Sequence, residues 1–314
     1  MSDLRVLVTC KQMQNVFEHF RDRFDAHGIQ ADLPEIRRQQ LSEDELVEII
    51  GDYDAIIAGD DPITARVLDH AARLKVIAKW GVGIDAIDVE AAKARNIPVS
   101  NTPGVFGEDV ADAALGYLLS LTRHLHEIHL AVREGKWLKI EGTRLAGKTA
   151  GVVGFGSIGH ATARRLVAFG CDVLVSDASE EALLRAPEIG ATAASLDDLL
   201  ARSEVLILCA PLNDDTHHLL DAEALAKLPA GALVVNVSRG PLVDEPALIE
   251  ALRSGHVAAA ALDVFEDEPL PMDSPLRSFE QCIFGSHNGS NTAEGVLQCS
   301  ARAVDNLMKG LGLE

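Results

Sequence analysis

Three polar side chains follow three successive apolar runs in the second half of the chain. Arg239 follows "ALVVNVS", Glu268 lies just beyond "AALDVF", and His287 follows "CIFGS". An arginine can hold a carboxylate, and a histidine can exchange a proton near neutral pH. Taken alone, His287 is open between three roles: a proton donor, a metal ligand, or a loop residue with a satisfied hydrogen bond.

A glycine motif of the form GxGxxG stands at Gly154, Gly156 and Gly159, within "GVVGFGSIGH". It directly follows an apolar, strand-like run and opens a helical stretch. In that context the first glycine permits a tight turn, the second lets the backbone approach a pyrophosphate, and the third lets helix and strand pack closely. The free N–H groups at the start of the helix then face the pyrophosphate, so the predicted cofactor set includes Ser157 and Ile158.

An acidic residue, Asp177, ends the apolar run that follows this helix. A carboxylate at that place can accept hydrogen bonds from both adenosine ribose hydroxyls, and it repels a 2′-phosphate. The sequence therefore predicts NAD in preference to NADP.

Short apolar runs alternate with helical stretches along the whole chain, which indicates parallel sheets with helices on both faces. In the first hundred residues the predicted strands are Arg5–Thr9, Asp54–Gly59, Leu74–Gly81 and Ile97–Asn101. One predicted helix begins at Ser42, which stands in capping-box spacing with Glu45. Another begins at Asp88.

A long helical region, from about Glu108 to Glu134, separates this series from a second one. The second series has six predicted strands, which match a complete doubly wound sheet. We therefore predict an α/β chain with two doubly wound parallel-sheet domains. A flavodoxin-like substrate domain takes residues 1–100 and 288–314, and a Rossmann NAD-binding domain takes residues 101–287.

Several longer motifs give the chain a family resemblance. They are "KWGVGIDAID", "NTPGVFGEDVADAALGYLL", the glycine motif, "VNVSRGPLVDEPALIEAL", "AALDVFEDEP" and the late histidine. Over nearly its whole length the chain resembles the D-isomer-specific 2-hydroxyacid dehydrogenases, especially the phosphoglycerate dehydrogenase-like members without a regulatory domain. The resemblance implies an NAD-dependent enzyme that transfers a hydride reversibly between NADH and a 2-oxo acid.

The resemblance also assigns site residues. It implies that Arg239, Glu268 and His287 form the catalytic group, with His287 as the acid and base. The chemistry agrees, because the new alkoxide needs a proton, the substrate carboxylate needs a cation, and Glu268 would favour the imidazolium. The complete cofactor set is Gly154, Gly156, Ser157, Ile158, Gly159, Asp177, Pro211, Thr216, Val237 and Asp263. The substrate set is Lys79, Val82, Gly83 and Arg239.

The substrate itself is not identified by these motifs. Phosphoglycerate enzymes of this kind usually place arginines where this chain has Gly59-Asp60-Asp61 and Lys79-Trp80. The two acids are expected to repel a phosphate, and Trp80 is expected to pack against an apolar or sugar-like tail. Phosphoglycerate is therefore a doubtful substrate.

Composition limits the other classes of function. The 314 residues carry 28 Lys and Arg against 48 Asp and Glu, a formal net charge of −20, which disfavours nucleic-acid and membrane partners. The five cysteines form no CxxC pair, and no metal site is expected. We expect a cytoplasmic homodimer formed through the helical region 108–134. An NADH-responsive corepressor or sensor of the same fold is the alternative to an enzyme.

Overall fold

The computed structural model describes residues 4–313, and the chain divides into two compact units. Unit 1 contains the residues up to Val105 together with those from Asn291 onward. Unit 2 runs from Phe106 to Ser290. Both boundaries lie a few residues later than those expected from the sequence.

Two hydrogen bonds explain where the units divide. The N–H of Thr102 donates to the carbonyl oxygen of Gly81 at 3.0 Å, which ties the turn after residue 100 to unit 1. The N–H of Gly289 donates to Oδ2 of Asp263 at 2.8 Å, which ties the turn after His287 to unit 2. Each turn at the boundary thus belongs to the unit that contains its hydrogen-bond partner.

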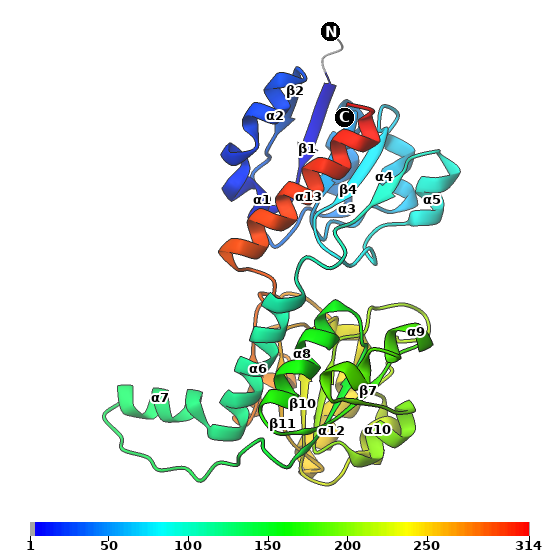
Figure 1. Ribbon diagram of the computed structural model, residues 1–314. Helices are drawn as coiled ribbons and strands as arrows, with labels where there is room; N and C mark the ends of the chain where they lie inside the picture. The colour runs from blue at the N-terminus through cyan, green and yellow to red at the C-terminus, as the bar shows by residue number, and fades with distance from the viewer. Residues whose placement is uncertain (1–3, 314) are drawn as a thin grey trace. The chain divides into compact units, whose positions relative to one another are not determined.

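The sheet of unit 1 has five parallel strands in the order β2-β1-β3-β4-β5 (Figure 1). This is the flavodoxin-like order. The direction in which successive strands are added to the sheet reverses between β1 and β3, although all strands are parallel. Every residue of β3 and β4 is buried, and both strands therefore appear in the sequence as continuous apolar runs. The strands are β1 (Leu4–Val8), β2 (Ile29–Asp32), β3 (Ala55–Ala58), β4 (Val76–Lys79) and β5 (Val99–Ser100).

The helices of unit 1 cover this sheet. Ser42 caps α3 as predicted, since its side chain accepts from the N–H of Glu45 while the Glu45 carboxylate accepts from the N–H of Ser42. The helices are α1 (Lys11–Val16), α2 (Arg21–Ala26), α3 (Glu43–Ile49), α4 (Ala65–His70), α5 (Val89–Ala94) and α13 (Ala293–Leu311), with 3-10 turns η1 (Phe17–His19) and η2 (Ile50–Asp52).

Helix α13 comes from the far end of the chain and packs on β3, β4 and α1. Thr292 caps it, its side chain accepting from the N–H of Gly295 at 2.9 Å. The buried face has helical spacing and comprises Val296, Cys299, Ala303, Val304, Leu307 and Met308. A Cβ at Gly310 would lie 2.3 Å from a methyl carbon of Val76, so a glycine is needed for this close approach.

The sheet of unit 2 has seven parallel strands in the order β12-β11-β10-β9-β6-β7-β8. The six strands predicted from the sequence are present. The seventh, β8, has two exposed residues and therefore gives no apolar run. The strands are β6 (Thr149–Val153), β7 (Asp172–Ser176), β8 (Thr192–Ala193), β9 (Val205–Leu208), β10 (Ala232–Asn236), β11 (Val257–Leu262) and β12 (Ile283–Phe284).

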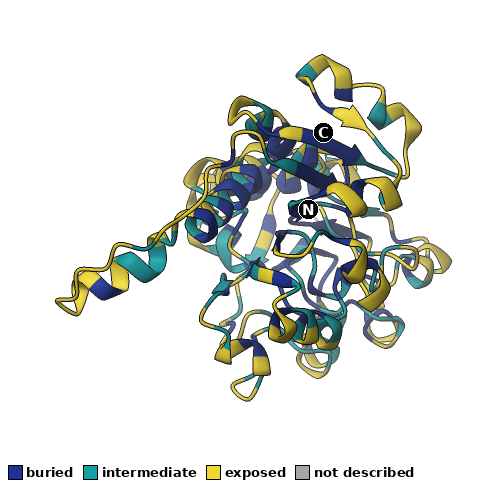
Figure 2. Ribbon diagram, turned by 90° about the horizontal axis from the view of Figure 1, so that it is seen from below, coloured by how far each residue is buried: buried dark blue, intermediate teal, exposed yellow. Residues whose placement is uncertain are grey.

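Helices also cover the sheet of unit 2, and α6 packs closely against α8. They are α6 (Gly107–Arg123), α7 (Leu125–Arg133), α8 (Ser157–Ala168), α9 (Glu180–Leu183), α10 (Leu196–Arg202), α11 (Ala222–Lys227) and α12 (Glu245–Ser254), with 3-10 turns η3 (Ala186–Ile189), η4 (Gly240–Leu242) and η5 (Pro275–Ser278). Figure 2 shows buried residues along the central strands and on one face of the longer helices, with exposed residues on the outer faces. Between residues 4 and 313, no helix combines the length and the apolar character that a membrane crossing requires.

The long helical region predicted from Glu108 to Glu134 is two helices, so the prediction of one continuous region is wrong at His124. That residue has φ +53°, in the left-handed region, which ends α6 and starts α7 in a new direction. Its Nδ1 lies 2.9 Å from a carboxylate oxygen of Glu127, which supports the unusual backbone conformation. The apolar pattern on either side is helical, and the sequence therefore gives no sign of the break. As a result α7 projects from the rest of unit 2 (Figure 1).

Candidate active site

The glycine motif forms a tight turn between β6 and α8. Gly154 has φ +89°, and a Cβ there would lie 2.5 Å from the backbone nitrogen of Ala210. A Cβ at Gly159 would lie 1.8 Å from the carbonyl oxygen of Gly154, so helix and turn meet without room for a side chain. Gly156, which precedes α8, is exposed and has open space around it. Two glycines therefore close the turn, and the third leaves the start of the helix accessible to an anion.

The carboxylate of Asp177 lies beside this turn. Its Oδ2 accepts from the N–H of Phe155 at 2.5 Å, and its Oδ1 accepts from the N–H of Ser179 at 2.8 Å. A carboxylate has about four acceptor positions, which leaves capacity for ribose hydroxyls. Arg185, which was not predicted as part of the site, donates to the carbonyl oxygen of Phe155 at 3.1 Å. The carboxylate of Asp177 thus binds the N–H of Phe155, and the guanidinium of Arg185 binds its carbonyl group.

Two further predicted cofactor residues lie in the loop after β9. The hydroxyl of Thr216 donates to the carbonyl oxygen of Pro211 at 2.7 Å, and it accepts from the N–H of Asn213 at 2.8 Å. These bonds close the loop into a compact turn at the carboxyl end of the strand. Val237, the first residue after β10, is buried.

Arg239 follows Val237 and is held by the residues around it. The side chain of Asn236 donates to the carbonyl oxygen of Arg239 at 2.8 Å, and its Oδ1 accepts from the N–H of Ser238 at 3.1 Å. A Cβ at Gly240 would lie 1.8 Å from the carbonyl carbon of Phe265. The arginine loop is therefore pressed against the loop after β11, where Glu268 lies.

Glu268 and His287 are in direct contact. Oε2 of Glu268 lies 2.8 Å from Nδ1 of His287, and Oε1 accepts from the N–H of Phe265 at 3.0 Å. Both side chains are about one-fifth exposed, at 20% and 22%. A carboxylate facing Nδ1 favours a proton on that nitrogen, which leaves Nε2 as the ring nitrogen that could exchange a proton.

Asp263, at the end of β11, is buried beneath the His287 turn. The N–H of His287 donates to the carbonyl oxygen of Asp263 at 2.7 Å. The hydroxyl of Tyr117, on α6, donates to Oδ1 of Asp263 at 2.8 Å. The sequence did not indicate Tyr117, because no local pattern connects two residues so far apart along the chain.

The predicted substrate residues of unit 1 lie at the carboxyl end of β4. Val82 and Gly83 are in an exposed turn that is tied back by a hydrogen bond from the N–H of Gly81 to the hydroxyl of Thr102. Lys79 is almost fully buried, and its Nζ donates to Oδ1 of Asp60 at 3.0 Å. The cation predicted for the substrate is therefore already paired with an acid of the preceding loop.

Two expectations about this loop are wrong. Trp80 is buried in unit 1, where its indole N–H donates to the hydroxyl of Ser300 at 2.9 Å, so it offers no surface to a substrate tail. Asp61 is also fully buried, and its oxygens accept from the backbone N–H groups of Leu41 and Gly59. A tryptophan and an acid in a loop look available in a sequence, but the fold uses both internally.

Comparison with known proteins shows the family. A model for the NAD-binding domain of the D-isomer specific 2-hydroxyacid dehydrogenases matches residues 115–289. The hydroxypyruvate reductase of Thermotoga maritima is 36% identical over 285 residues, which cover 89% of this chain and 92% of that protein. The chain belongs to the D-isomer specific 2-hydroxyacid dehydrogenase family.

Two other similarities agree with this assignment. The glyoxylate reductase of Thermofilum pendens is 39% identical over 274 residues, covering 85% of this chain and 81% of that protein. The crystal structure of the TT0316 protein from Thermus thermophilus has a TM-score of 0.85 at 36% identity, covering 98% of this chain and 97% of that one. The resemblance stated from the motifs is thus confirmed. This 2-hydroxyacid dehydrogenase is an oxidoreductase with NAD as its cofactor.

The residues of unit 2 fit that cofactor. The turn before α8 leaves open space at Gly156, and an acid lies at Asp177, as a pyrophosphate and an adenosine ribose require. Among residues 4–313, His, Cys, Asp and Glu side chains form no cluster that could hold a metal ion.

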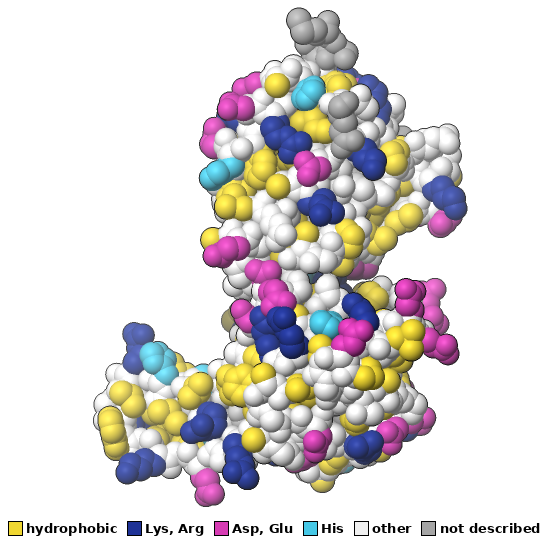
Figure 3. All heavy atoms as spheres, in the orientation of Figure 1, with side chains coloured by type: hydrophobic (Ala, Val, Ile, Leu, Met, Phe, Trp, Pro, Cys, Tyr) yellow, Lys and Arg dark blue, Asp and Glu magenta, His cyan; other side chains and the backbone are white. Residues whose placement is uncertain are grey.

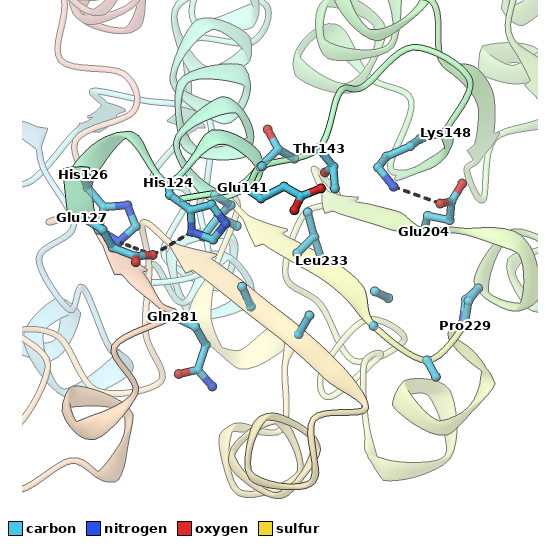
Figure 4. Close-up of a pocket in the computed structure, with 18 residues that line it drawn as sticks. His124, His126, Glu127, Glu141, Thr143, Lys148, Glu204, Pro229, Leu233 and Gln281 are labelled. Atoms are coloured by element: carbon cyan, nitrogen blue, oxygen red, sulfur yellow. Dashed lines mark hydrogen bonds and ion pairs between the residues drawn. The ribbon is translucent and has the colours of Figure 1, made fainter. Parts of the chain in front are cut away.

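A cavity of about 290 Å³ lies at the amino ends of the strands of unit 2. Figure 4 shows His124, His126 and Glu127 on one side of it and the Lys148–Glu204 ion pair on another. The ring nitrogens of His126 are buried there without a hydrogen-bond partner. The predicted site residues follow the carboxyl ends of the strands, so this cavity is separate from the candidate site.

Proposed function

We propose that the enzyme interconverts a small 2-oxo acid and the D-2-hydroxy acid, with His287 as the acid and base. The observation that carries the proposal is the 2.8 Å contact between Nδ1 of His287 and Oε2 of Glu268, on a loop against which the Arg239 loop is packed. A histidine oriented by a carboxylate, with an arginine on the adjoining loop, is the set of groups that reduction of a 2-oxo acid needs.

Each residue has a separate part in the reaction. Bound NADH supplies the hydride that reaches C2 of the 2-oxo acid. The carbonyl oxygen of the substrate then takes a proton from Nε2 of His287, which completes the hydroxyl group. Glu268 stabilises the imidazolium before the transfer and holds the ring in one orientation. In the reverse direction the neutral ring accepts the proton from the hydroxyl.

The substrate carboxylate is assigned to Arg239 and to the turn after β4. A guanidinium can make two parallel hydrogen bonds to a carboxylate, which fixes the plane of the 2-oxo acid. The backbone N–H groups of Val82 and Gly83 are further candidate donors. Lys79 is a weaker candidate, because Asp60 and the carbonyl oxygen of Trp80 already accept from it.

The substrate is proposed to be small. Two relatives are named as reductases of hydroxypyruvate and glyoxylate, which have short, uncharged ends beyond the 2-oxo acid group. Asp60, whose side chain is 42% exposed, places a negative charge beside Lys79, and this charge disfavours a phosphate. We therefore expect glyoxylate or hydroxypyruvate to be reduced faster than 3-phosphohydroxypyruvate.

The test is NADH oxidation with a panel of 2-oxo acids, with NADH binding measured in parallel. The proposal expects turnover of at least one acid, and loss of that turnover in Arg239→Ala without loss of NADH binding. Binding of NADH with no turnover of any acid would contradict it and would favour an NADH-responsive sensor.

We also propose that the chain is a homodimer through the helical region 108–134. Support comes from α7 and the segment after it, where hydrophobic side chains gather on the surface of a projecting element (Figure 3). The exposed ones include Leu125, Leu130, Val132, Trp137 and Leu138, with Trp137 81% exposed. A second copy of the chain is the proposed occupant, since an apolar patch of this kind on a projecting helix is typical of a protein interface.

This second proposal can be tested with two matched variants. Leu130→Glu places a charge on α7, and Leu184→Glu places the same charge on another exposed leucine of unit 2. Light scattering should find a dimer for the parent and for Leu184→Glu, and a monomer for Leu130→Glu. A monomeric parent at micromolar concentration would contradict the proposal.

A further inference from the structure

The backbone at His287 has an unusual conformation. Its φ is +54°, in the left-handed region that residues with a side chain seldom adopt. Such a conformation is less favourable than the ordinary right-handed or extended ones, and it persists only where the surroundings hold it. The proposed proton donor therefore depends on other groups for its position.

One residue, Asp263, accepts hydrogen bonds from three successive backbone N–H groups of this turn. Its carbonyl oxygen accepts from His287 at 2.7 Å, its Oδ1 from Asn288 at 3.2 Å, and its Oδ2 from Gly289 at 2.8 Å. Consecutive N–H groups around a left-handed residue form a concave anion site. Here the anion in that site is a carboxylate of the same chain.

The carboxylate itself accepts from two of these N–H groups, those of Asn288 and Gly289, and it has a third donor. The hydroxyl of Tyr117, from α6, donates to Oδ1 of Asp263 at 2.8 Å. Asp263 is only 2% exposed, so its charge is stable only because these donors replace water. Burial, and the negative charge of Asp263, raise the pKa of Tyr117 far above its ordinary value, so the phenol remains a donor at any working pH.

Gly285 makes this arrangement possible. A Cβ on Gly285 would lie 2.1 Å from Oδ1 of Asp263 and 2.1 Å from the hydroxyl oxygen of Tyr117. Any side chain at this position would therefore separate the two groups or displace the turn that carries His287.

We propose that Asp263 and Tyr117 are positioning residues for His287, holding its left-handed turn so that Nδ1 meets Glu268 and Nε2 points in one direction. The inference rests on the proposed function for its kinetic consequences. It adds Tyr117, a residue outside every predicted set, to the machinery of proton transfer. It also gives Asp263 a role apart from the cofactor binding that the family resemblance implies.

Tyr117 distinguishes the two roles of Asp263, because its hydrogen bond in the site is with that carboxylate. The chain has two tyrosines, and Tyr53 donates to Asp32 in unit 1, so Tyr53→Phe removes the same type of bond elsewhere. Tyr117→Phe should lower kcat about tenfold, about 1.4 kcal/mol. The KM of the 2-oxo acid and the dissociation constant of NADH should stay within about twofold of the parent values. Tyr53→Phe should behave as the parent.

The solvent isotope effect gives a readout that a purely structural role would not move. If Tyr117→Phe misplaces the proton donor, proton transfer becomes slower relative to the other steps, and the effect of D₂O on kcat should increase. An unchanged kcat and isotope effect in Tyr117→Phe would overturn the proposal. So would a loss of kcat matched by an equal loss of NADH affinity, since Asp263 would then serve the cofactor.

A measurement without turnover keeps the proposal separate from the proposed function. The Nδ1–H proton of His287, assigned by its loss in His287→Asn, can be followed by NMR in the NADH-bound protein. In the parent, contact with Glu268 should protect this proton from exchange with water, and Tyr117→Phe should speed the exchange while Tyr53→Phe should not. Equal exchange rates in the two variants would overturn the inference even if the parent reduced no 2-oxo acid.

Discussion

The loops at the carboxyl ends of the two sheets use similar residues in opposite ways. In unit 1, at the carboxyl ends of β3 and β4, Asp61 is fully buried and Lys79 is nearly so, and both are hydrogen-bonded to other groups of unit 1. In unit 2, after β10 to β12, the side chains of Glu268 and His287 are about one-fifth exposed. The carboxyl ends of the strands thus carry internally bonded charged groups in unit 1 and partly exposed titratable groups in unit 2.

The difference arises from the donors that each loop supplies. Asp61 accepts from the N–H groups of Leu41 and Gly59 and from the hydroxyl of Thr9, so its oxygens are hydrogen-bonded within unit 1. One oxygen of Glu268 accepts from the N–H of Phe265, and its other oxygen faces His287. A carboxylate whose second oxygen faces a titratable ring can influence proton transfer, whereas one surrounded by N–H groups stabilises the loop.

The largest expected effect removes the reactive ring from unit 2. His287→Asn should lower kcat by roughly 10²–10⁴ while the dissociation constant of NADH changes little, because the proton donor is lost and the glycine turn is not. His27→Asn, at an exposed position in unit 1, is the control and should keep the parent kcat. Steady-state kinetics with NADH titration would measure both quantities. A His287→Asn variant with parental kcat would rule out the proton-donor role.

The next prediction concerns the buried acid of unit 1. Asp61→Ala leaves the buried N–H of Leu41 without its acceptor and leaves the N–H of Gly59 with only the hydroxyl of Thr9, so it should lower the free energy of unfolding by about 2 kcal/mol. Urea unfolding would measure the loss, with Asp52→Ala, whose side chain is 77% exposed, as the control. Equal stability of the two variants would show that Asp61 is not the support that its contacts suggest.

The pH dependence of that loss has a definite sign. Burial raises the pKa of Asp61 above its ordinary value of 3.8, against hydrogen bonds from Thr9, Leu41 and Gly59 that lower it. Between 3.8 and the raised value the folded state binds more protons than the unfolded state, so the contribution of Asp61 to stability falls as the pH rises. The loss in Asp61→Ala should therefore be larger below this window than above it.

A smaller effect is expected at the cofactor turn of unit 2. The carboxylate of Asp177 both accepts from backbone N–H groups of the turn and is expected to contact a ligand. Asp177 accepts from two backbone N–H groups, yet we expect it to select NAD over NADP by at least about tenfold in kcat/KM, or about 1.4 kcal/mol. Asp177→Ala should reduce that preference, since it removes the repulsion of a 2′-phosphate and leaves Arg185 nearby. Asp172→Ala, at the other end of β7, should not. Equal use of the two cofactors by the parent would contradict the prediction.

The smallest change removes a charge and keeps the shape. In Glu268→Gln the imidazolium of His287 loses its carboxylate partner, so reduction should fail at a lower pH than in the parent. Oxidation needs the neutral ring, and its rising limb should move to lower pH as well. Full pH profiles of kcat in both directions would show this, with Glu280→Gln on the exposed surface as the control. Profiles identical to those of the parent would mean that Glu268 does not tune the ring.

Much of the fold could be predicted because its strands are local apolar runs and its turns carry local motifs. The capping box at Ser42 and the glycine turn at Gly154 each lie within a few residues of sequence. The strands β2 and β8 were missed because one is short and partly exposed and the other has two residues. The break at His124 was also missed, because the apolar residues on both sides of it have the spacing of one continuous helix.

In the candidate site, too, the sequence predicts residues that lie in local patterns and misses contacts between distant segments. Arg239, Glu268 and His287 could be proposed from the sequence because each follows a strand, and the ends of parallel strands meet at one edge. Tyr117 and Gly285 could not be proposed from the sequence, because they lie close to Asp263, which is 146 residues away from Tyr117 along the chain. Trp80 was misjudged because its burial depends on Ser300, in the last helix. Contacts between distant segments are the part that local patterns do not contain.

Helix α13 gives the molecule an order of assembly. Unit 1 has all its strands early in the chain, but the helix that covers β3 and β4 is translated only after the whole of unit 2. During synthesis, unit 2 therefore has all its elements available first, which reverses the usual order in which the amino-terminal domain folds first. Until α13 emerges, Val76 and its neighbours remain uncovered, and a nascent chain paused in unit 2 presents an apolar sheet face to chaperones.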